Sequence, residues 1–302
     1  MGTSSWDSKD WDSFSSSTST KSTAQVFSQN FMHKDLNPHG VAMRESRDSA
    51  ANPNSTAIIV GSDVTGSMGY LAEALVRQGM GVLVEELLAR KPVSDPHIMC
   101  MGVGDAYSDD APLQVTQFEA DIRIATQLAQ IWLEGQGGGN GGESYHLPWY
   151  FAARHTSIDC FEKRKKKGYL FTVGDENPHK VLRREQVKAI FGDDIERDLT
   201  SEELLTMASR TYNVFHLLVE ESNSCNSSVK ANWKALLGER ALPLSDHTKM
   251  AELIVSTIQV IEGTASVDDT VKSWSGGTSM VVARGLNGLQ PARAAGTGLM
   301  RF

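Results

Sequence analysis

The chain reads Ala57-Ile58-Ile59-Val60-Gly61-Ser62-Asp63-Val64-Thr65-Gly66-Ser67-Met68-Gly69 at the place that decides its fold. An apolar run ends in a carboxylate, and two hydroxyl side chains follow at alternate positions, in the pattern Asp63-x-Thr65-x-Ser67. A continuous apolar run is typical of a central parallel strand, because both faces of such a strand are covered. A buried strand with oxygen ligands at its C-terminal end is a common way for α/β proteins to hold Mg²⁺. The stretch therefore predicts an α/β sheet with a metal site at the end of this strand.

Strands and helices alternate on the C-terminal side of this stretch. Apolar runs predict strands at residues 57–62, 98–103, 169–173 and 212–219, with a short edge strand at 113–118. Apolar residues at three- and four-residue spacings predict helices at 71–89, 122–133, 144–156, 183–191, 202–211 and 246–262. This alternation predicts a doubly wound, mostly parallel sheet with helices on both faces.

Composition suggests one α/β domain between two extensions. Residues 1–54 are rich in Ser, Thr, Asp and Asn and are expected to form a disordered or loosely attached arm. Residues 55–263 carry the alternating elements, and residues 264–302 are expected to form a Gly-rich, basic tail. Within the arm, Trp6-Asp7-Ser8 recurs as Trp11-Asp12-Ser13. This repeat is either a chance feature or a short motif whose aromatic side chains bind a partner.

Charge and cysteine content limit which partners and which cellular compartment the sequence predicts. The 302 residues carry a net charge of -8, which argues against a nucleic acid as the main partner. Three cysteines in no zinc-ligand spacing favour a reducing compartment. We see no secretory signal and no apolar stretch long enough to span a membrane. The sequence therefore predicts a cytoplasmic protein that does not bind membranes.

Three segments are expected to meet at one edge of the sheet, because ligands of open α/β sheets bind outside the carboxyl ends of the strands. The first is Asp63-x-Thr65-x-Ser67, and the third is Asp175, which directly follows the strand predicted at 169–173. The second precedes a predicted helix and reads Gly137-Gly138-Gly139-Asn140-Gly141-Gly142-Glu143-Ser144.

This trio resembles the metal-ion-dependent adhesion site of von Willebrand factor A domains, in motif and in order along the chain. The resemblance covers roughly residues 55–263 and implies a metal-dependent protein-binding module. It implies that Thr65 and Ser67 bind Mg²⁺ or Mn²⁺ through their hydroxyls, while Asp63 and Asp175 hold metal-bound waters. A coordination position then stays open for an acidic group of a partner. By family analogy, that partner is an AAA+ ATPase of the MoxR type.

The second segment departs from the family pattern. The family places a threonine there, whereas no Ser or Thr occurs between Thr126 and Ser144. Asn140 stands nearest the expected position, and its amide carbonyl is an acceptable hard ligand. Glu143 is the other candidate. The glycines could also serve only to allow a tight turn.

Other functions fit these residues less well. A phosphatase of the haloacid dehalogenase type needs a second aspartate two residues after Asp63, where Thr65 stands. A serine hydrolase elbow needs a glycine at position 65, and neither a Walker A motif nor a Rossmann glycine fingerprint is present. We therefore expect no enzyme, with a metal-dependent hydrolase as a distant alternative. The stronger alternative is a structural protein that assembles through its two extensions, with a non-essential metal site.

Overall fold

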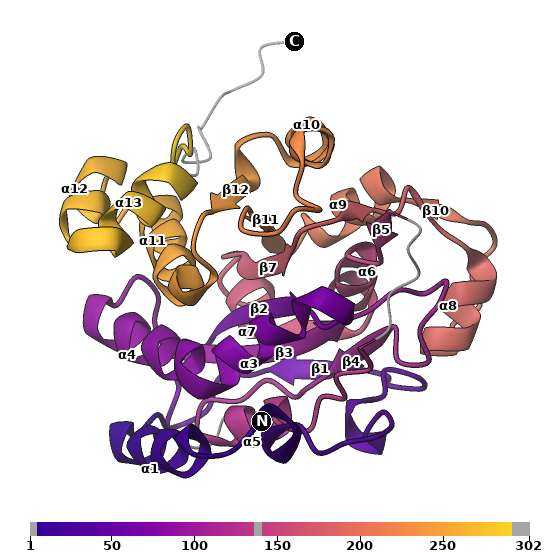
Figure 1. Ribbon diagram of the computed structural model, residues 1–302, viewed down its shortest axis with the longest axis horizontal. Helices are drawn as coiled ribbons and strands as arrows, with labels where there is room; N and C mark the ends of the chain where they lie inside the picture. The colour runs from indigo at the N-terminus through magenta and orange to yellow at the C-terminus, as the bar shows by residue number, and fades with distance from the viewer. Residues whose placement is uncertain (1–4, 136–140, 292–302) are drawn as a thin grey trace.

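The computed structural model describes residues 5–135 and 141–291, and a six-stranded sheet lies at its centre (Figure 1). In spatial order the strands are β12 (Ala241–Leu244), β11 (Tyr212–Val219), β7 (Gly168–Gly174), β2 (Thr56–Asp63), β3 (Pro96–Val103) and β4 (Leu113–Val115). Neighbouring strands are parallel except at the edge, where β4 runs antiparallel to β3. The predicted α/β class with a mostly parallel sheet is confirmed.

The apolar run of β2 is buried on both faces, as its composition predicts. Ile58 and Val60 belong to one core cluster, whereas Ala57 and Ile59 belong to the other. Successive side chains of a strand point to opposite faces, so a strand in the middle of a covered sheet needs apolar residues at every position.

Helices cover both faces of this sheet (Figure 1). One face carries the helices α3 (Gly69–Ala74), α4 (Met80–Arg90), α5 (Arg123–Leu128) and α11 (Met250–Glu262). The other carries α6 (His146–Arg154), α7 (Asp159–Glu162), α8 (Arg184–Phe191), α9 (Ser201–Ala208) and α10 (Ser227–Leu237). The helix predicted at 71–89 is divided into α3 and α4 by a π-helical turn, Leu75–Gly79.

Short elements complete the fold. Three two-stranded ladders pair β1 (Arg44–Ser46) with β6 (Thr156–Ile158), β5 (Gly142–Glu143) with β8 (Asn177–Pro178), and β9 (Val181–Leu182) with β10 (Leu199–Thr200). Single 3-10 turns occur at Lys34–Leu36, Gly66–Met68, Gly238–Arg240 and His247–Lys249. Within the described residues, none of the helices combines the length and the apolar character needed to cross a bilayer.

The N-terminal segment differs from the loosely attached arm expected for residues 1–54. Residues 8–19 form helix α1 (Ser8–Ser19), a second short helix is α2 (Thr23–Val26), and Trp11 is only 3% exposed. The Trp6 indole nitrogen donates to the carbonyl of Pro96 at 3.0 Å, and the Arg77 guanidinium donates to the carbonyls of Thr18 and Lys21. A few large aromatic side chains attach this segment, since each of them buries much apolar area. They do not follow a periodic pattern in the sequence.

The C-terminal segment also differs from the tail expected for residues 264–302. Two helices, α12 (Val267–Lys272) and α13 (Gly276–Gly285), pack beside α11, and Val282 and Leu286 are fully buried. The Trp274 ring lies 3.6 Å from the guanidinium carbon of Arg90, at the C-terminal end of α4. Gly276, Gly277, Ala283 and Gly285 therefore belong to the packed helix α13. Residues 292–302 lie outside the described residues.

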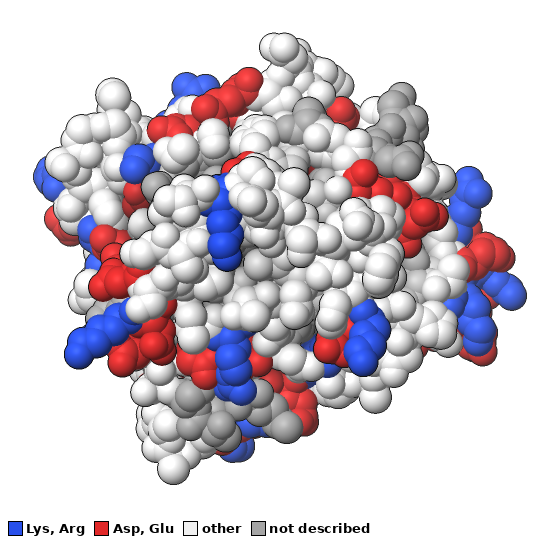
Figure 2. Space-filling view, turned by 60° about the horizontal axis from the view of Figure 1, so that its bottom comes forward, with Lys and Arg blue, Asp and Glu red and all other residues white. Residues whose placement is uncertain are grey.

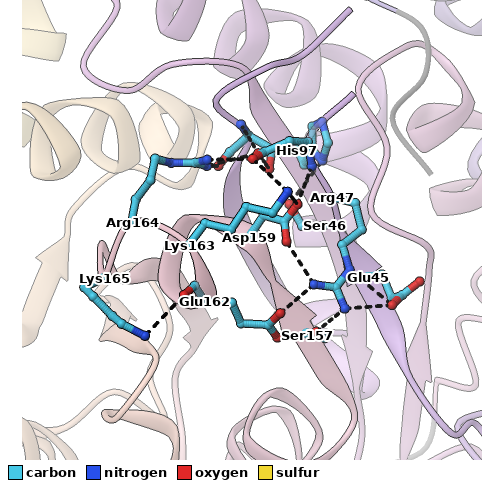
Figure 3. Close-up of polar contacts among 12 residues, drawn as sticks. Glu45, Ser46, Arg47, His97, Ser157, Asp159, Glu162, Lys163, Arg164 and Lys165 are labelled. Carbon is cyan, nitrogen blue, oxygen red and sulfur yellow. Dashed lines mark hydrogen bonds and ion pairs between the residues drawn. The ribbon is translucent and has the colours of Figure 1, made fainter. Parts of the chain in front are cut away.

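The basic run at residues 163–167 lies beside acidic partners (Figure 3). Lys163 contacts Asp159 at 2.7 Å and Asp48 at 3.3 Å, and Arg164 contacts Asp48 at 2.7 Å. Arg47 also pairs with Asp159, at 2.9 Å. These ion pairs attach the segment before β2 to α7. On the face of the molecule in Figure 2, Lys and Arg side chains are interspersed with Asp and Glu over a largely uncharged surface.

Removal of the Trp11 side chain tests the attachment of the N-terminal segment. We expect Trp11→Ala to lower the free energy of unfolding by about 3–5 kcal/mol, the usual range for a buried tryptophan. The control is Asp12→Ala, an exposed residue of the same helix, which should stay within about 0.5 kcal/mol of wild type. Urea unfolding measures both variants. Equal stability of Trp11→Ala and wild type would contradict the packed position.

Candidate metal centre

The first and third predicted segments meet at the point where the strand order of the sheet reverses. From β2 the chain proceeds outward through β3 to β4, and it then returns to β7 on the other side of β2. This strand order leaves a crevice outside the carboxyl ends of β2 and β7, where doubly wound folds bind ligands. Asp63 is the last residue of β2, and Asp175 directly follows β7.

Asp63 is fully buried and accepts three hydrogen bonds. Its Oδ1 accepts from the Thr65 backbone N–H at 2.9 Å and from the Thr65 hydroxyl at 2.7 Å. Its Oδ2 accepts from the Tyr145 hydroxyl at 2.6 Å. Burial is the main cause that raises the pKa of Asp63 to about 7, and the charge of Asp175 raises it further. The hydrogen bonds oppose this shift, because they stabilise the ionised form.

Tyr145 connects the two strand ends. Besides donating to Asp63, its hydroxyl oxygen accepts from the backbone N–H of Asp175 at 3.2 Å. The ring is fully buried against His216 and Trp233. A Cβ atom at Gly174 would overlap the Tyr145 hydroxyl, so β7 needs glycine as its last residue. One hydroxyl group therefore fixes the spacing of the two loops.

Asp175 is 2% exposed, and its Oδ2 accepts a short hydrogen bond from the Ser222 hydroxyl. Ser222 lies in the loop after β11, the next strand along the sheet. Three neighbouring strands of the sheet thus supply polar side chains to this edge.

Glu143 comes from the two-residue strand β5, at the end of the glycine-rich segment. Its side chain is 6% exposed, and its Oε2 is buried without a hydrogen-bond partner among the described residues. Burial raises the pKa of Glu143 to about 9, and the charges of Asp63, Asp105 and Asp109 add to the shift. Proximity to the Thr65 side chain partly opposes it. Glu143 therefore lies beside Thr65, within electrostatic reach of Asp63.

These residues fit a small divalent cation. Asp63, Thr65, Glu143 and Asp175 offer only oxygen atoms, the ligands that Mg²⁺ prefers. Within the described residues, none of the three carboxylates forms an ion pair with Lys or Arg. The charge of Asp175 raises the pKa of Asp63, the charge of Asp63 raises the pKa of Glu143, and a cation would relieve this repulsion. Because the Thr65 hydroxyl donates its proton to Asp63, its lone pairs stay available to a metal ion.

The structure brings together four of the predicted site residues: Asp63, Thr65, Glu143 and Asp175. The backbone of Ser67 lies in the 3-10 turn Gly66–Met68, directly after Thr65, while its side chain lies outside the described residues. Asn140, the other predicted ligand of the second segment, also lies outside the described residues. Below, "the candidate site" means these four residues.

Two residues that hold the site, Tyr145 and Ser222, are not among those predicted from the sequence. Tyr145 and Ser222 hold the two aspartates of the candidate site. Asp105, two residues after β3, is fully buried and lies 2.7 Å from His179 Nε2 and 3.1 Å from the Ser144 hydroxyl. Asp175 is selected because the carboxyl ends of parallel strands share one edge of the sheet. The same rule applies to Ser222, because Ser222 follows the next parallel strand. No pattern in the sequence indicates the contact of Tyr145 with Asp63.

A second group of ligand types lies on neighbouring loops of this edge. One ligand atom each of Glu221, Asp246 and His247 lies within 4.8 Å of the others, and the Tyr70 ring packs against His247. Glu221 is exposed, and its Oε2 already accepts from His247 Nδ1 at 2.8 Å. Exposed groups of this kind are common in the absence of any metal.

No protein-family profile matches the chain, and no curated protein matches it in sequence. Among solved structures, the chain is similar to the pilus adhesin SpaC from Lactobacillus rhamnosus GG in its open conformation. That alignment has a TM-score of 0.47 and 9% identity, and it covers 71% of this chain and 31% of the adhesin. A second crystal structure of the same adhesin aligns with a TM-score of 0.45 and 9% identity, over 71% of this chain and 32% of the adhesin. The chain spans about a third of the length of these adhesins.

The raised pKa of Asp63 predicts how pH changes the stability of the metal-free protein. The pKa is about 7 in the folded chain, against an ordinary value of 3.8, so the folded state binds more protons than the unfolded state between these values. The additional proton on Asp63 stabilises the folded state. This stabilisation is complete below pH 3.8 and is lost as pH rises through 7.

Asp63→Asn removes this titration and keeps the shape of the side chain. In EDTA, the variant should gain stability relative to wild type as pH rises from 5 to 7, by at most about 1.4 kcal/mol per pH unit. Urea unfolding of both proteins at several pH values measures this difference in the free energy of unfolding. The buried histidines are the same in both proteins, so their opposite contributions cancel in the difference. A difference that does not change with pH would contradict the raised pKa.

Proposed function

We propose that this chain is a metal-dependent protein-binding module of the von Willebrand factor A type, and that Mg²⁺ or Mn²⁺ at the candidate site captures an acidic group of a partner protein. The observation that carries the proposal is that three buried carboxylates and a hydroxyl lie at one edge of the sheet, at the strand ends where such folds bind ligands, and that the charge of Asp175 acts on Asp63 and that of Asp63 on Glu143. The buried Oε2 of Glu143, which has no partner among the described residues, is the observation most specific to a cation ligand.

The hydrogen bonds suggest different roles for the oxygen ligands. Both oxygens of Asp63 and one oxygen of Asp175 already accept protein hydrogen bonds, which suits contact with the cation through water. The Thr65 hydroxyl and the Glu143 carboxylate are available for direct contact. Ser67 is the further hydroxyl ligand that the family resemblance implies, and Asn140 stays the alternative to Glu143. When bound, the cation supplies an electrophilic centre for a carboxylate.

Catalysis is not part of this proposal. Thr65 stands where a phosphatase of the dehalogenase type would need its general acid, and Asp63, which would be the nucleophile, accepts hydrogen bonds at both oxygens. A nucleophilic carboxylate needs a free, accessible oxygen.

The partner follows from the chemistry of the site. A cation with an open coordination position would bind an exposed Asp or Glu side chain of another protein, and family analogy suggests an AAA+ ATPase of the MoxR type. The scarcity of cysteine, with all three cysteines free and buried, supports a cytoplasmic location.

Melting temperatures with and without metal test the site. At about 100 times its Kd, Mg²⁺ should stabilise the fold by about 2.7 kcal/mol, which raises the Tm by roughly 5–10 °C. Thr65→Val removes the hydroxyl at nearly constant volume and should lose most of this shift. Thr206→Val, an exposed position on α9, is the matched control and should keep it. Identical shifts in wild type and Thr65→Val would exclude the site.

The dependence of partner binding on metal separates this function from the assembly alternative. A partner held through the cation should dissociate in EDTA and should not bind Thr65→Val. A complex or self-assembly that persists in EDTA, and that Thr65→Val also forms, would favour a structural protein with a non-essential metal site. Size-exclusion chromatography with light scattering measures both.

A further inference from the structure

Glu143 differs from the other carboxylates of the candidate site in having an oxygen atom that nothing satisfies. Asp63 is held by Thr65 and Tyr145, and Asp175 is held by Ser222. Glu143 is also buried, but its Oε2 has no hydrogen-bond partner among the described residues. A buried carboxylate in this situation either takes up a proton or meets a cation.

The backbone on both sides of this side chain is fixed. Strand β5 pairs with β8 in the register Gly142 to Asn177 and Glu143 to Pro178, and the His179 N–H donates to the Glu143 carbonyl at 3.2 Å. The next residue is also held, because the Ser144 N–H donates to the carbonyl of Gly104 at 3.3 Å. Glu143 is therefore directed at Thr65 and Asp63 by paired backbone and not by a freely placed loop.

The segment that carries Glu143 contributes three consecutive contacts to this region. Glu143 lies beside Thr65, the Ser144 hydroxyl donates to Asp105 at 3.1 Å, and the Tyr145 hydroxyl donates to Asp63. Because Tyr145 is locked between the ends of β2 and β7, the backbone that carries Glu143 is held at the candidate site, while the Glu143 side chain can still change rotamer.

We propose that Glu143 is a direct ligand of the bound cation and occupies the coordination position that a partner's carboxylate would take, so that the chain caps its own metal site. This inference rests on the proposed function, because it concerns the regulation of the same site. A partner's carboxylate then reaches the cation only by displacing the carboxylate of Glu143. The internal ligand lowers the affinity of the cation for weakly binding carboxylates. Only partners whose carboxylate competes effectively with Glu143 then bind.

Water-proton relaxation by bound Mn²⁺ tests this directly, because relaxivity rises with the number of exchangeable waters on the ion. In Glu143→Gln, the relaxivity per bound Mn²⁺ should rise by the contribution of an additional water. The Mn²⁺ affinity should fall by at least about 10-fold, because a direct ligand contributes no less than an outer-shell partner. Acetate is the probe for a partner's carboxylate. It should lower the relaxivity of the variant by replacing that water, with little effect on wild type.

Two further variants keep the experiment decisive. Glu143→Asp keeps the charge but shortens the side chain by a methylene, so its relaxivity should also rise. Glu202→Gln, an exposed carboxylate in the first turn of α9, should behave as wild type. If wild type binds Mn²⁺ and the relaxivity of both Glu143 variants equals that of wild type, Glu143 does not cap the site and the proposed function stands. If wild type binds no Mn²⁺, the proposed function and this inference both fail.

Discussion

The hydrogen bond from the Tyr145 hydroxyl to Asp63 is the interaction on which the carboxyl edge of the sheet depends. It joins the end of β2 to the end of β7, because the same hydroxyl accepts from the backbone of Asp175. It also explains the glycine at position 174, where a side chain would overlap the tyrosine. With the ring fixed against His216 and Trp233, the two aspartates of the candidate site are held in place before any cation arrives.

This arrangement is electrostatically unfavourable in the absence of a counter-charge. Burial and mutual repulsion raise the pKa of Asp63 to about 7 and that of Glu143 to about 9, so the metal-free site keeps protons that the same side chains would lose in water. A divalent cation would compete with these protons. Metal affinity should therefore increase with pH across this range, and binding should release protons.

Much of the fold could be predicted from local patterns. Continuous apolar runs located β2, β3, β7 and β11, because strands covered on both faces need apolar residues throughout. Strand β12 escaped prediction, since it has four residues and contains Pro243. A proline is compatible with β12 because the strand lies at the edge of the sheet. The extensions differ from the expectation because a few widely spaced side chains, among them Trp11 and Leu286, attach them without a periodic signal.

The candidate site was predictable only in part, for a physical reason. The rule that parallel strands share a carboxyl edge brings Asp63 and Asp175 together from the sequence alone. Which side chains then hold these aspartates depends on tertiary placement. Tyr145 reaches Asp63 across 82 positions of the chain, and Ser222 reaches Asp175 across 47. No local spacing encodes such contacts, so the neighbours of a site are less predictable than its ligands.

The most direct test of a cation at the carboxyl edge is a crystal structure of the protein grown with Mn²⁺, with an anomalous difference map at the manganese edge. We predict a strong peak between Thr65 and Glu143, near the ends of β2 and β7, with Asp63 and Asp175 in the surrounding shell. A map with no peak there at saturating Mn²⁺, or with its only peak at Glu221, Asp246 and His247, would contradict the account.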